Sequence, residues 1–465
     1  MILRSSRQSA PSDGNRMLAD LRREFATSRT RSLDWRIDQL RGIERLVEER
    51  ENDIAAALAE DLGRSAFETW LGEVASTKAE AVHARKHLKR WMRPRRAQLP
   101  LNQLPGKAWM QYEPLGVVLI IGPWNYPLYL SLAPLVAAVA AGNCAVIKPS
   151  ELAPATSELL ARLIPEYLDR DAVNVVEGDA STTQELLAAG FDHALFTGGT
   201  EIGRKIMAAA APTLTPVTLE LGGKSPVIVA SDADLDVTAR RIVFAKLINS
   251  GQTCIAPDYI LADRNIAEEL VDKICTTVTE FRSAEQDPSL RIVNQRQFDR
   301  LVALVAGTDG TVVLGGGSDP STLHMEPTVI VDPSPTDGVM ATEIFGPILP
   351  VLTVESVDAA VDFVNSGPKP LAMYVFTSSS KMGHDIVDRV PAGGAVINHV
   401  AMHVLVPSLP FGGVGASGMG AYHGKWGFEA MSHRKAVLSK PTRLDPRLIY
   451  PPHSERALKI IRRLF

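Results

Sequence analysis

The sequence of 465 residues has little cysteine and no excess of positive charge. Its three cysteines, Cys144, Cys254 and Cys275, form no Cys-x-x-Cys pair, which argues against a disulfide framework or a zinc site. We therefore expect no bound metal and a reducing compartment, the cytoplasm. The formal net charge of −4 would not attract a phosphate backbone, so nucleic acid is not an expected partner. Residues 1–15 lack the apolar core of a signal peptide and are expected to form a loose tail.

One long stretch lacks charge altogether, because residues 115–147 contain no Asp, Glu, Lys or Arg. A membrane span needs about 18 to 20 apolar residues, so the stretch is long enough to be one. However, prolines and the pair Gly142-Asn143 interrupt it, and we predict strand 116–121, helix 128–141 and strand 144–148. Strands buried on both faces of a parallel sheet read as continuous apolar runs, so we expect a sheet core here.

Helix and strand patterns divide the rest of the chain into lobes of the α/β class. Apolar residues at helical spacing between residues 15 and 62, and between 73 and 92, predict amphipathic helices. The proline-rich residues 94–114 predict an extended arm or linker. Strand and helix patterns then alternate from residue 117, and a second series runs from 226 to 398. This alternation is the signature of βαβ units in mostly parallel sheets.

Two glycine-rich segments are candidates for binding a dinucleotide. The first, Gly198-Gly199-Thr200-Glu201-Ile202-Gly203, follows a predicted strand and opens a helix, so its backbone amides can face a pyrophosphate or ribose. It departs from the usual Gly-x-Gly-x-x-Gly pattern, and a plain strand-to-helix turn is the alternative. Residues 413–418 match that pattern but follow Pro410-Phe411 instead of a strand, so we interpret them as a structural loop.

Polar residues also follow the two strands predicted within the uncharged stretch. Lys148 and Glu151 come at the carboxyl end of the second strand, where ligands of parallel sheets bind. Both can hydrogen-bond ribose hydroxyls, and Glu151 would repel a 2′-phosphate, which favours NAD without excluding NADP. A solvated pair beside a turn proline is the alternative. After the first strand, Asn125 lies between prolines in a turn that could aim its amide at an oxyanion, or could simply cap the turn.

The most informative pair is Glu220, within Leu-Glu-Leu-Gly-Gly-Lys, and Cys254, within Gly-Gln-Thr-Cys-Ile-Ala-Pro-Asp-Tyr. A thiolate attacks carbonyl carbons, and a carboxylate can deprotonate the thiol or the water that cleaves a thioester. A free cysteine is often only a small buried apolar residue. Here Gly251 and two polar residues precede it, which favours a loop with an accessible thiol. The pair predicts covalent catalysis on an aldehyde, in a cleft between the two lobes.

Seven ordered motifs resemble those of the aldehyde dehydrogenases, and the resemblance extends from about residue 15 to the C-terminus. They are Pro-Trp-Asn-Tyr-Pro (123–127), Lys-Pro-Ser-Glu (148–151), Phe-Thr-Gly-Gly-Thr (196–200), Leu-Glu-Leu-Gly-Gly-Lys-Ser-Pro (219–226), Gly-Gln-Thr-Cys (251–254), Glu-Ile-Phe-Gly-Pro (343–347) and Pro-Phe-Gly-Gly-Val-Gly-Ala-Ser-Gly (410–418). The residues after Cys254 and the ending Tyr-Pro-Pro-His-Ser-Glu (450–455) resemble the class-three branch of fatty and aromatic aldehyde dehydrogenases.

The resemblance implies a three-part fold and a homodimer. A Rossmann-like NAD-binding domain is expected from residues 1–92 and 115–221, and an α/β catalytic domain from 222–402. A bridging or oligomerisation segment is expected from 93–114 and about 403–440, followed by a C-terminal tail, 441–465. Fatty-aldehyde members add a C-terminal membrane helix, whereas this chain stops at Phe465 after a short basic stretch, so no integral membrane anchor is expected.

The resemblance also implies a role for each motif residue. Cys254 would attack the aldehyde, Asn125 and the Cys254 backbone N–H would hold the oxyanion, and Glu220 would activate water to hydrolyse the thioester. The cofactor is expected to be NAD, with NADP possible. Lys148 and Glu151 would bind the adenosine ribose, and Ile202 would lie near the adenine. Glu343 would hold the nicotinamide ribose, with Phe345 beside the nicotinamide ring. The residues around the rest of the cofactor would be Gly198, Gly199, Thr200 and Gly203.

Two other functions compete with hydrolytic aldehyde oxidation. An acylating dehydrogenase would pass the thioester to coenzyme A, but it would not need Glu220 as a base. A dehydrogenase-like binding protein would not need Asn125, Glu220 and Cys254 together. The expected tunnel residues, Tyr129 and residues 398–411 with His399 and His403, predict an apolar pocket for medium-chain aliphatic or aromatic aldehydes.

Overall fold

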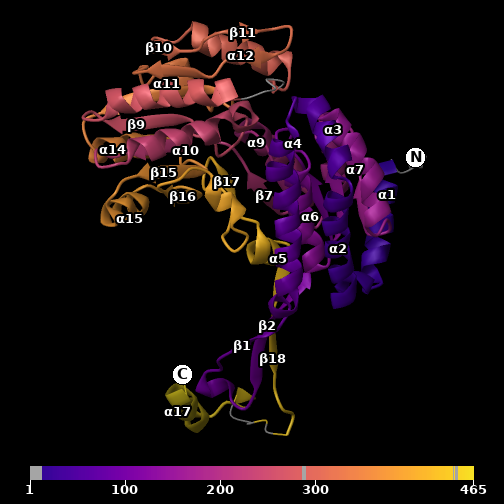
Figure 1. Cartoon of the computed structure of the whole chain (residues 1–465). Helices are drawn as coiled ribbons and strands as arrows, with labels where there is room; N and C mark the ends of the chain where they lie inside the picture. The colour runs from indigo at the N-terminus through magenta and orange to yellow at the C-terminus, as the bar shows by residue number, and fades with distance from the viewer. Residues whose placement is uncertain (1–12, 285–289, 444, 446–448, 465) are drawn as a thin grey trace, which may run out of the picture.

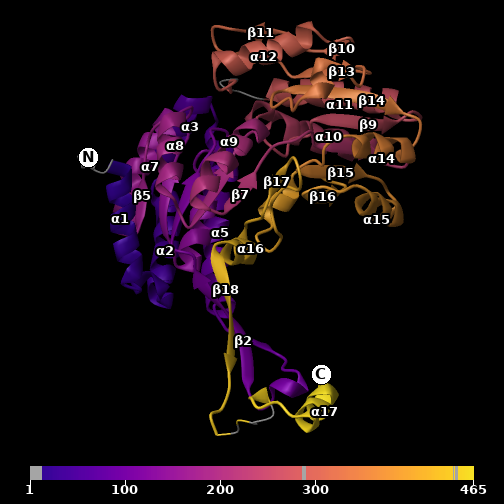
Figure 2. The ribbon, with the colours of Figure 1, turned by 180° about the vertical axis from the view of Figure 1, so that it is seen from behind.

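The computed structural model describes residues 13–284, 290–443, 445 and 449–464. It consists of two α/β lobes that lie side by side and a narrow arm that extends away from the first lobe (Figure 1). The N-terminal end lies on the outer side of the first lobe, and the C-terminal end lies at the tip of the arm (Figures 1 and 2). The α/β fold class predicted from the sequence is confirmed.

The first lobe is built on a six-stranded sheet in which every strand except the edge strand β17 runs parallel. Its strands, in spatial order, are β17 (Gly418–Met419), β7 (Val217–Glu220), β6 (His193–Thr197), β3 (Val117–Ile121), β4 (Cys144–Lys148) and β5 (Val173–Val175). The helices of this lobe are α1 (Asp13–Ala26), α2 (Leu33–Glu49), α3 (Glu51–Leu62), α5 (Ser76–Trp91), α6 (Tyr129–Ala141), α7 (Pro154–Tyr167), α8 (Ala180–Ala189), α9 (Thr200–Ala210) and α16 (Gly424–Ala430).

The uncharged stretch forms the centre of this lobe, as predicted. Strands β3 and β4 are buried at every position, and all thirteen residues of α6 between them are buried. Prolines and Gly142, with φ 90°, end each segment where the pattern indicated. Among the described residues, no helix combines the length and apolar character needed to cross a membrane.

The second lobe is built on a seven-stranded sheet that is parallel except at β10. In spatial order its strands are β10 (Thr311–Leu314), β13 (Thr328–Val331), β14 (Ile348–Val354), β9 (Tyr259–Asp263), β8 (Pro226–Val229), β15 (Ala372–Phe376) and β16 (Gly394–Ile397). Its helices and a small hairpin are α10 (Leu235–Leu247), α11 (Ala267–Ala284), α12 (Gln295–Ala306), α13 (Gly338–Ala341), α14 (Val357–Ser366), α15 (Ser380–Arg389), β11 (Ser318–Asp319) and β12 (His324–Met325).

Short helical turns join these elements. They are η1 (Arg29–Arg31), α4 (Ala66–Thr69), the π-helical turn η2 (Trp70–Ala75), η3 (Leu101–Gln103), η4 (Ala211–Thr213), η5 (Ile248–Gly251) and η6 (Met402–Leu405).

The arm is a three-stranded antiparallel sheet of β1 (Arg95–Ala97), β2 (Lys107–Pro114) and β18 (Ser432–Ser439). Residues 94–114 therefore form an extended arm, as predicted, although two strands give it regular structure. Helix α17 (Glu455–Leu464) lies at the tip of the arm (Figure 2).

Two boundaries differ from those expected. Asp13–Ala26 is helical, so residues 13–15 belong to α1 and not to a loose tail, while residues 1–12 lie outside the described part. Residues 403–431 do not join the arm, because β17 pairs with β7 and α16 packs on α5 and α6 of the first lobe. No sequence pattern marks this return, since β17 has only two residues.

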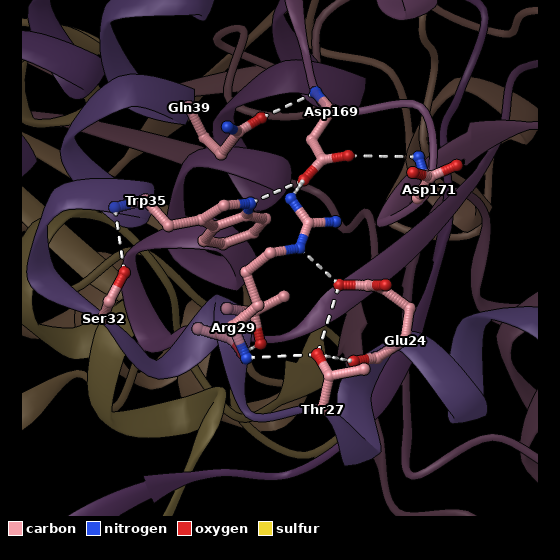
Figure 3. A network of polar contacts seen from close by, with 10 residues as sticks. Glu24, Thr27, Arg29, Ser32, Trp35, Gln39, Asp169 and Asp171 are labelled. Carbon is pink, nitrogen blue, oxygen red and sulfur yellow. Dashed lines mark hydrogen bonds and ion pairs between the residues drawn. The ribbon is translucent and has the colours of Figure 1, made fainter.

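A polar network attaches the N-terminal helices to the sheet beside β5 (Figure 3). The Asp169 carboxylate accepts hydrogen bonds from the Trp35 indole at 2.7 Å and the Arg29 guanidinium at 2.5 Å. The Asp169 backbone N–H donates to Oε1 of Gln39 at 2.8 Å, and Arg29 also pairs with Glu24 at 2.6 Å. Burial alone would raise the pKa of Asp169, but the hydrogen bonds from Arg29 and Trp35 outweigh it and hold that pKa below its usual value.

We expect Asp169→Asn to lower the free energy of unfolding by about 1 to 2 kcal/mol at neutral pH, because the ionised partner of Arg29 is lost. The folded-state pKa is depressed, so the wild-type advantage is complete above the unfolded pKa of about 3.9 and disappears as the pH falls further. Denaturant unfolding at several pH values measures this. Asp38→Asn is the matched control, because Asp38 only faces Arg41 at 3.8 Å on the surface; an equal loss in the control would contradict the prediction.

Candidate active site

Glu220 and Cys254 line the same cavity, which has a volume of about 690 Å³. Glu220 is the last residue of β7, at the carboxyl edge of the first sheet. Cys254 lies in the loop between η5 and β9, in the second lobe. The structure therefore brings the thiol and the carboxyl to the junction of the two lobes, where the sequence predicted a cleft.

The loop before Cys254 has an unusual backbone. Asn249, Ser250 and Gly251 have φ values of 53°, 51° and 69°, so three consecutive residues adopt a left-handed conformation. Such a conformation costs about 1 to 3 kcal/mol for each residue other than glycine and persists only where the surroundings impose it. At Gly251 a Cβ would lie 2.3 Å from the Gly346 carbonyl oxygen, so only glycine fits.

Side chains of the loop hold this conformation in place. The Gln252 amide donates to the carbonyls of Asn249 at 3.1 Å and Arg291 at 3.0 Å, and its oxygen accepts from Val293 N–H at 3.0 Å. Beyond the cysteine, the Tyr374 hydroxyl donates to the Ile255 carbonyl. Cys254 is therefore presented by a loop that is fixed on both sides.

Asn125 connects the first lobe to this loop. The side-chain Nδ2 of Asn125 donates to the Gln252 backbone carbonyl at 3.1 Å. The backbone carbonyl of Asn125 accepts from Asn249 Nδ2 at 3.0 Å and from the Arg64 guanidinium. One N–H of the Asn125 amide remains beyond the bond to Gln252. The predicted neighbourhood of Asn125 and Cys254 is therefore present.

An ion pair that the sequence did not reveal supports Asn125 from behind. Arg64 and Glu73 are 2.6 Å apart, with side-chain exposures of 1% and 0%. The second Glu73 oxygen accepts from the Tyr129 backbone N–H at 2.6 Å, so it also holds the start of α6. Glu73 begins the predicted charged helix of residues 73–92, in which most charges are solvated, and Arg64 lies just after the predicted helices of residues 15–62, so no local signal marks either residue.

Burial dominates the electrostatics of Glu220 and Cys254. Glu220 is 2% exposed, neither of its carboxyl oxygens has a hydrogen-bond partner in the described part of the chain, and burial raises its pKa well above the usual value. Burial, with smaller contributions from Glu343 and Glu220, raises the pKa of the Cys254 thiol to about 12. The Cys254 thiol is therefore protonated near pH 7, and Glu220, whose ionisation is opposed by burial, is a stronger base than an exposed carboxylate once it has ionised.

The predicted ribose pair lies at the carboxyl end of β4. Lys148 is 3% exposed, and its ammonium lies 2.8 Å from the carboxylate of Glu151, which is exposed. Two polar groups of opposite charge thus meet at the sheet edge, one fixed by burial and one open to solvent.

The segment of residues 198–203 turns from β6 into α9. A Cβ on Gly198 would lie 2.4 Å from the Phe196 ring, and one on Gly203 would lie 2.5 Å from Leu221, whereas Gly199 faces open space. No side chain caps the helix at Gly199, so its first backbone N–H groups are open, and Ile202 is 48% exposed beside them. This is a suitable cradle for a phosphate or ribose.

The second glycine-rich loop, residues 413–418, packs against this turn instead of forming a separate site. Thr200 Oγ1 donates to the Ala416 carbonyl at 3.3 Å, Leu221 N–H donates to the Ser417 carbonyl at 3.1 Å, and Gly418 pairs with Glu220 between β17 and β7. The interpretation of residues 413–418 as a structural loop is confirmed.

Glu343 and Phe345 approach from the second lobe. A Cβ on Gly222 would lie 2.0 Å from Glu343 Oε2, so glycine permits the carboxyl to reach the end of β7. Oε1 of Glu343 is buried without a partner, and burial, followed by the charge of Asp258, raises the Glu343 pKa to about 8. The Phe345 ring meets the Trp124 ring edge-on at 5.3 Å.

Lys224, which the sequence did not single out, holds the segment that carries Glu343. Its ammonium pairs with Asp258 and donates to the carbonyls of Val339 at 2.8 Å and Thr342 at 3.0 Å. Lys224 is part of the Leu-Glu-Leu-Gly-Gly-Lys motif, so its position four residues after Glu220 was the available signal.

The cavity wall is largely apolar. Tyr129 lines it, as expected, and residues 398–411 contribute part of the wall, but His399 and His403 are not among the lining residues. His403 is instead half-buried against Gly394, where a Cβ would lie 2.8 Å from its ring. Lining residues that sequence reasoning missed include Phe67, Leu71, Phe244 and Phe281.

Comparisons with known proteins agree with this geometry. Residues 2–437 match the family model described as "Aldehyde dehydrogenase family". The chain is 46% identical to rat aldehyde dehydrogenase family 3 member A2, over 95% of this chain and 92% of the relative. It is 44% identical to family 3 member H1 of Arabidopsis thaliana, over 97% and 95%.

Solved structures show the same relationship. A substrate-bound state of Staphylococcus aureus AldH has a TM-score of 0.94 and 40% identity, covering 98% of this chain and all of that one. An NAD-dependent aldehyde dehydrogenase from Sinorhizobium meliloti has a TM-score of 0.86 and 28% identity, covering 94% of this chain and 89% of that one. The chain therefore belongs to the aldehyde dehydrogenase family, as its seven motifs predicted, and is an NAD(P)-dependent enzyme that oxidises an aldehyde.

Proposed function

We propose that this oxidation is hydrolytic and releases the free carboxylic acid, with Cys254 as nucleophile, Asn125 as oxyanion donor and Glu220 as base. The observation that carries the proposal is that Cys254 and Glu220 line one cavity, with the Asn125 amide bonded to the loop that carries the cysteine. Thiol and base then share one desolvated cavity, and the donor lies behind the cysteine loop, in surroundings where electrostatic stabilisation is stronger than in water.

The first half of the reaction takes place at Cys254. The thiol loses its proton and the sulfur attacks the aldehyde carbon, so that the carbonyl oxygen becomes an oxyanion. The Asn125 amide and the Cys254 backbone N–H stabilise that oxyanion. Hydride then leaves the former aldehyde carbon, and a thioester remains on the sulfur.

The second half takes place at Glu220. Its carboxylate removes a proton from a water molecule, the resulting hydroxide attacks the thioester carbon, and the acid departs as the Cys254 sulfur is released. Burial raises the pKa of Glu220, so the ionised, active form increases in population as the pH rises. The rate of hydrolysis should therefore increase with pH.

The cofactor is NAD, with NADP possible, and the residues present fit it. Lys148 and Glu151 would bind the adenosine ribose, the turn of residues 198–203 would hold the phosphates, and the unpartnered Glu343 oxygen would accept a nicotinamide ribose hydroxyl. Ile202 would lie beside the adenine and Phe345 beside the nicotinamide. When bound, the nicotinamide accepts the hydride that the aldehyde carbon releases. The Sinorhizobium neighbour is described as NAD-dependent, which supports this assignment.

The substrate is an aromatic or medium-chain aliphatic aldehyde. The cavity wall is rich in aromatic and branched side chains, including Phe67, Leu71, Tyr126 and Phe411. Its one arginine, Arg282, faces Glu326 at 3.5 Å and so has an acidic neighbour already. An apolar substrate gains about 25 cal/mol for each Å² that it removes from water.

The parts of the fold take the roles expected of them: the first lobe binds the cofactor and the second carries the catalytic cysteine. The arm pairs two subunits into a homodimer. Strand β18 lies at one edge of the arm sheet, and strand β16 lies at one edge of the sheet of the second lobe. One side of each strand therefore has no neighbouring strand among the described residues, and such edges are sites of strand pairing between chains.

Acylation of coenzyme A is the alternative outcome of the same thioester. A buried carboxyl beside the thiol favours hydrolysis, because a thiol acceptor needs no water activation. Turnover of an aldehyde in the presence of coenzyme A, followed by product analysis, decides between them. Free acid is expected, and acyl-coenzyme A with little free acid would overturn the proposal.

Replacing Cys254 by alanine should abolish oxidation and leave NAD binding nearly intact, because the thiol makes the covalent bond and the ribose contacts lie elsewhere. NADH formation and calorimetric titration with NAD measure the two effects. Cys275→Ala, in helix α11 outside the cavity, is the matched control and should keep both. Unchanged turnover in Cys254→Ala would exclude the mechanism.

Glu220→Gln should slow the steady state by about 100-fold or more while a first burst of NADH persists, since a general base contributes about 10² to 10⁴ in rate. Stopped-flow NADH absorbance separates burst from steady state, with the surface variant Glu185→Gln as control. A variant that lost the burst but hydrolysed a preformed thioester at the wild-type rate would contradict this assignment.

Glu73→Gln should destabilise the first lobe by about 3 to 5 kcal/mol, because it leaves the buried Arg64 charge unpaired. Since Arg64 also binds the Asn125 carbonyl, kcat should fall even at temperatures where the variant is folded. Thermal unfolding and kinetics at low temperature measure both. Glu48→Gln, which loses an exposed pair with Lys78, should show neither effect, and equal behaviour of the two variants would refute the prediction.

A further inference from the structure

One residue of the cavity wall is connected to a buried polar chain that the reaction above does not use. Tyr129 lines the cavity from the first turn of α6, and its hydroxyl lies 3.2 Å from Nε2 of His423. On the other side of the ring, Nδ1 of His423 lies 3.2 Å from Oε1 of Glu80, on α5. Tyr129, His423 and Glu80 are 6%, 2% and 2% exposed. Three buried polar side chains from separate elements thus end at the substrate cavity.

The surroundings fix the orientation of the His423 ring. The Phe411 ring, which also lines the cavity, stacks on it at 5.3 Å, and the Tyr422 ring meets it edge-on at 4.5 Å. His423 has φ 82°, a conformation that costs about 1 to 3 kcal/mol outside glycine. The second Glu80 oxygen accepts from Gly424 N–H at 3.2 Å, which leaves Oε1 for His423. Oε1 of Glu80 and Nδ1 of His423 face each other at 3.2 Å, and neither atom makes an aligned hydrogen bond with any described residue, so a small rotation of either side chain completes the chain.

We propose that the Tyr129 hydroxyl determines specificity within the cavity, that His423 and Glu80 orient it, and that it selects aldehydes carrying a second oxygen able to hydrogen-bond. The proposal rests on the function proposed above, because it concerns the substrate of the same site. An apolar pocket barely distinguishes ligands that differ by one small group, whereas a buried polar group discriminates against a ligand that leaves it unpaired. Burial raises the Tyr129 pKa, followed by the charges of Glu80 and Glu73 and then that of Cys254, in keeping with a hydroxyl near the reacting sulfur.

The protonation of Glu80 decides whether Tyr129 donates or accepts. Burial, then His403, lowers the pKa of His423 to about 3, so its ring is neutral and carries one proton. A protonated Glu80 donates to Nδ1, Nε2–H donates to Tyr129, and the hydroxyl proton is left for the substrate. An ionised Glu80 accepts from Nδ1–H, Nε2 accepts from Tyr129, and only oxygen lone pairs face the substrate.

This exchange falls near neutral pH. Burial raises the pKa of Glu80 to about 7, opposed by the hydrogen bond from Gly424. Two further titratable groups, Tyr422 and His403, lie beside His423. Two others, Glu73 and Cys254, lie near Tyr129, and the charge of Glu73 is paired with Arg64. Selection of a substrate oxygen that only accepts should therefore weaken as the pH rises through about 7.

Matched pairs of benzaldehydes test the proposal with NAD as cofactor. Comparing kcat/KM for 3-hydroxybenzaldehyde and 3-methylbenzaldehyde should show a preference for the hydroxyl compound. Tyr129→Phe should reduce that preference about 3- to 10-fold, the value of one hydrogen bond. Tyr167→Phe is the matched control and should leave it unchanged, because the Tyr167 hydroxyl contacts only Arg50 and Glu49, on the outer helices.

The pH dependence tests the role of Glu80 separately. The preference for 3-methoxybenzaldehyde over 3-ethylbenzaldehyde should decrease in the wild type between pH 6 and pH 8, centred at about 7. In Glu80→Gln it should be constant, because the amide oxygen stays on Gly424 N–H and the amide N–H groups only donate to His423. This measurement on the wild type keeps the proposal testable even if a variant does not fold.

The outcomes are distinguishable. An unchanged hydroxyl preference in Tyr129→Phe overturns the specificity role, and a pH dependence that persists in Glu80→Gln, or is absent from the wild type, overturns the role of Glu80. If the wild type oxidises none of these aldehydes but turns over others, the proposed substrate class fails and the inference fails with it.

Discussion

The catalytic geometry depends on the hydrogen bonds that join Asn125 to the cysteine loop. Asn125 belongs to the first lobe and Cys254 to the second, and two bonds of 3.0 to 3.1 Å between Asn125 and residues 249–252 fix their relative position. The strained backbone at residues 249–251 is stable only because these bonds and the side chain of Gln252 compensate for it. A loose contact here would separate the proposed oxyanion donor from the proposed nucleophile, and preorganised donors are among the larger contributions to catalysis.

Behind the apolar side chains of the cavity wall, pairs of charged or polar side chains hold the residues of the site in position. The Arg64–Glu73 pair holds Asn125, the Lys224–Asp258 pair holds the segment of Glu343, and Glu80 with His423 holds Tyr129. In each case charged or polar groups are buried away from the substrate and satisfied mainly by one another or by backbone. This arrangement keeps the cavity suited to an apolar aldehyde while its few polar groups remain fixed.

The residues of the chemistry could be predicted from the sequence because they occur in contiguous motifs at the ends of strands. The boundaries of β3, α6 and β4 could be predicted as well, because proline, glycine and an uncharged run mark them within a residue or two. The importance of Arg64, Glu73 and Asn249 could not be predicted, since each acts through a hydrogen bond to a residue distant in the chain. The return of β17 and α16 to the first lobe was missed for the same reason, because a two-residue edge strand has no sequence pattern.

The burial of Glu220 has two opposing effects on the reaction. It raises the pKa and so opposes ionisation, and it also makes the ionised base stronger and leaves both carboxyl oxygens without competing partners among the described residues. A carboxyl that is bonded to neither lysine nor backbone is free to bind water, whereas a paired one would be ionised more often but would be a weaker base. The same buried position at the end of β7 that lowers the population of the active base therefore favours water as the acceptor of the thioester.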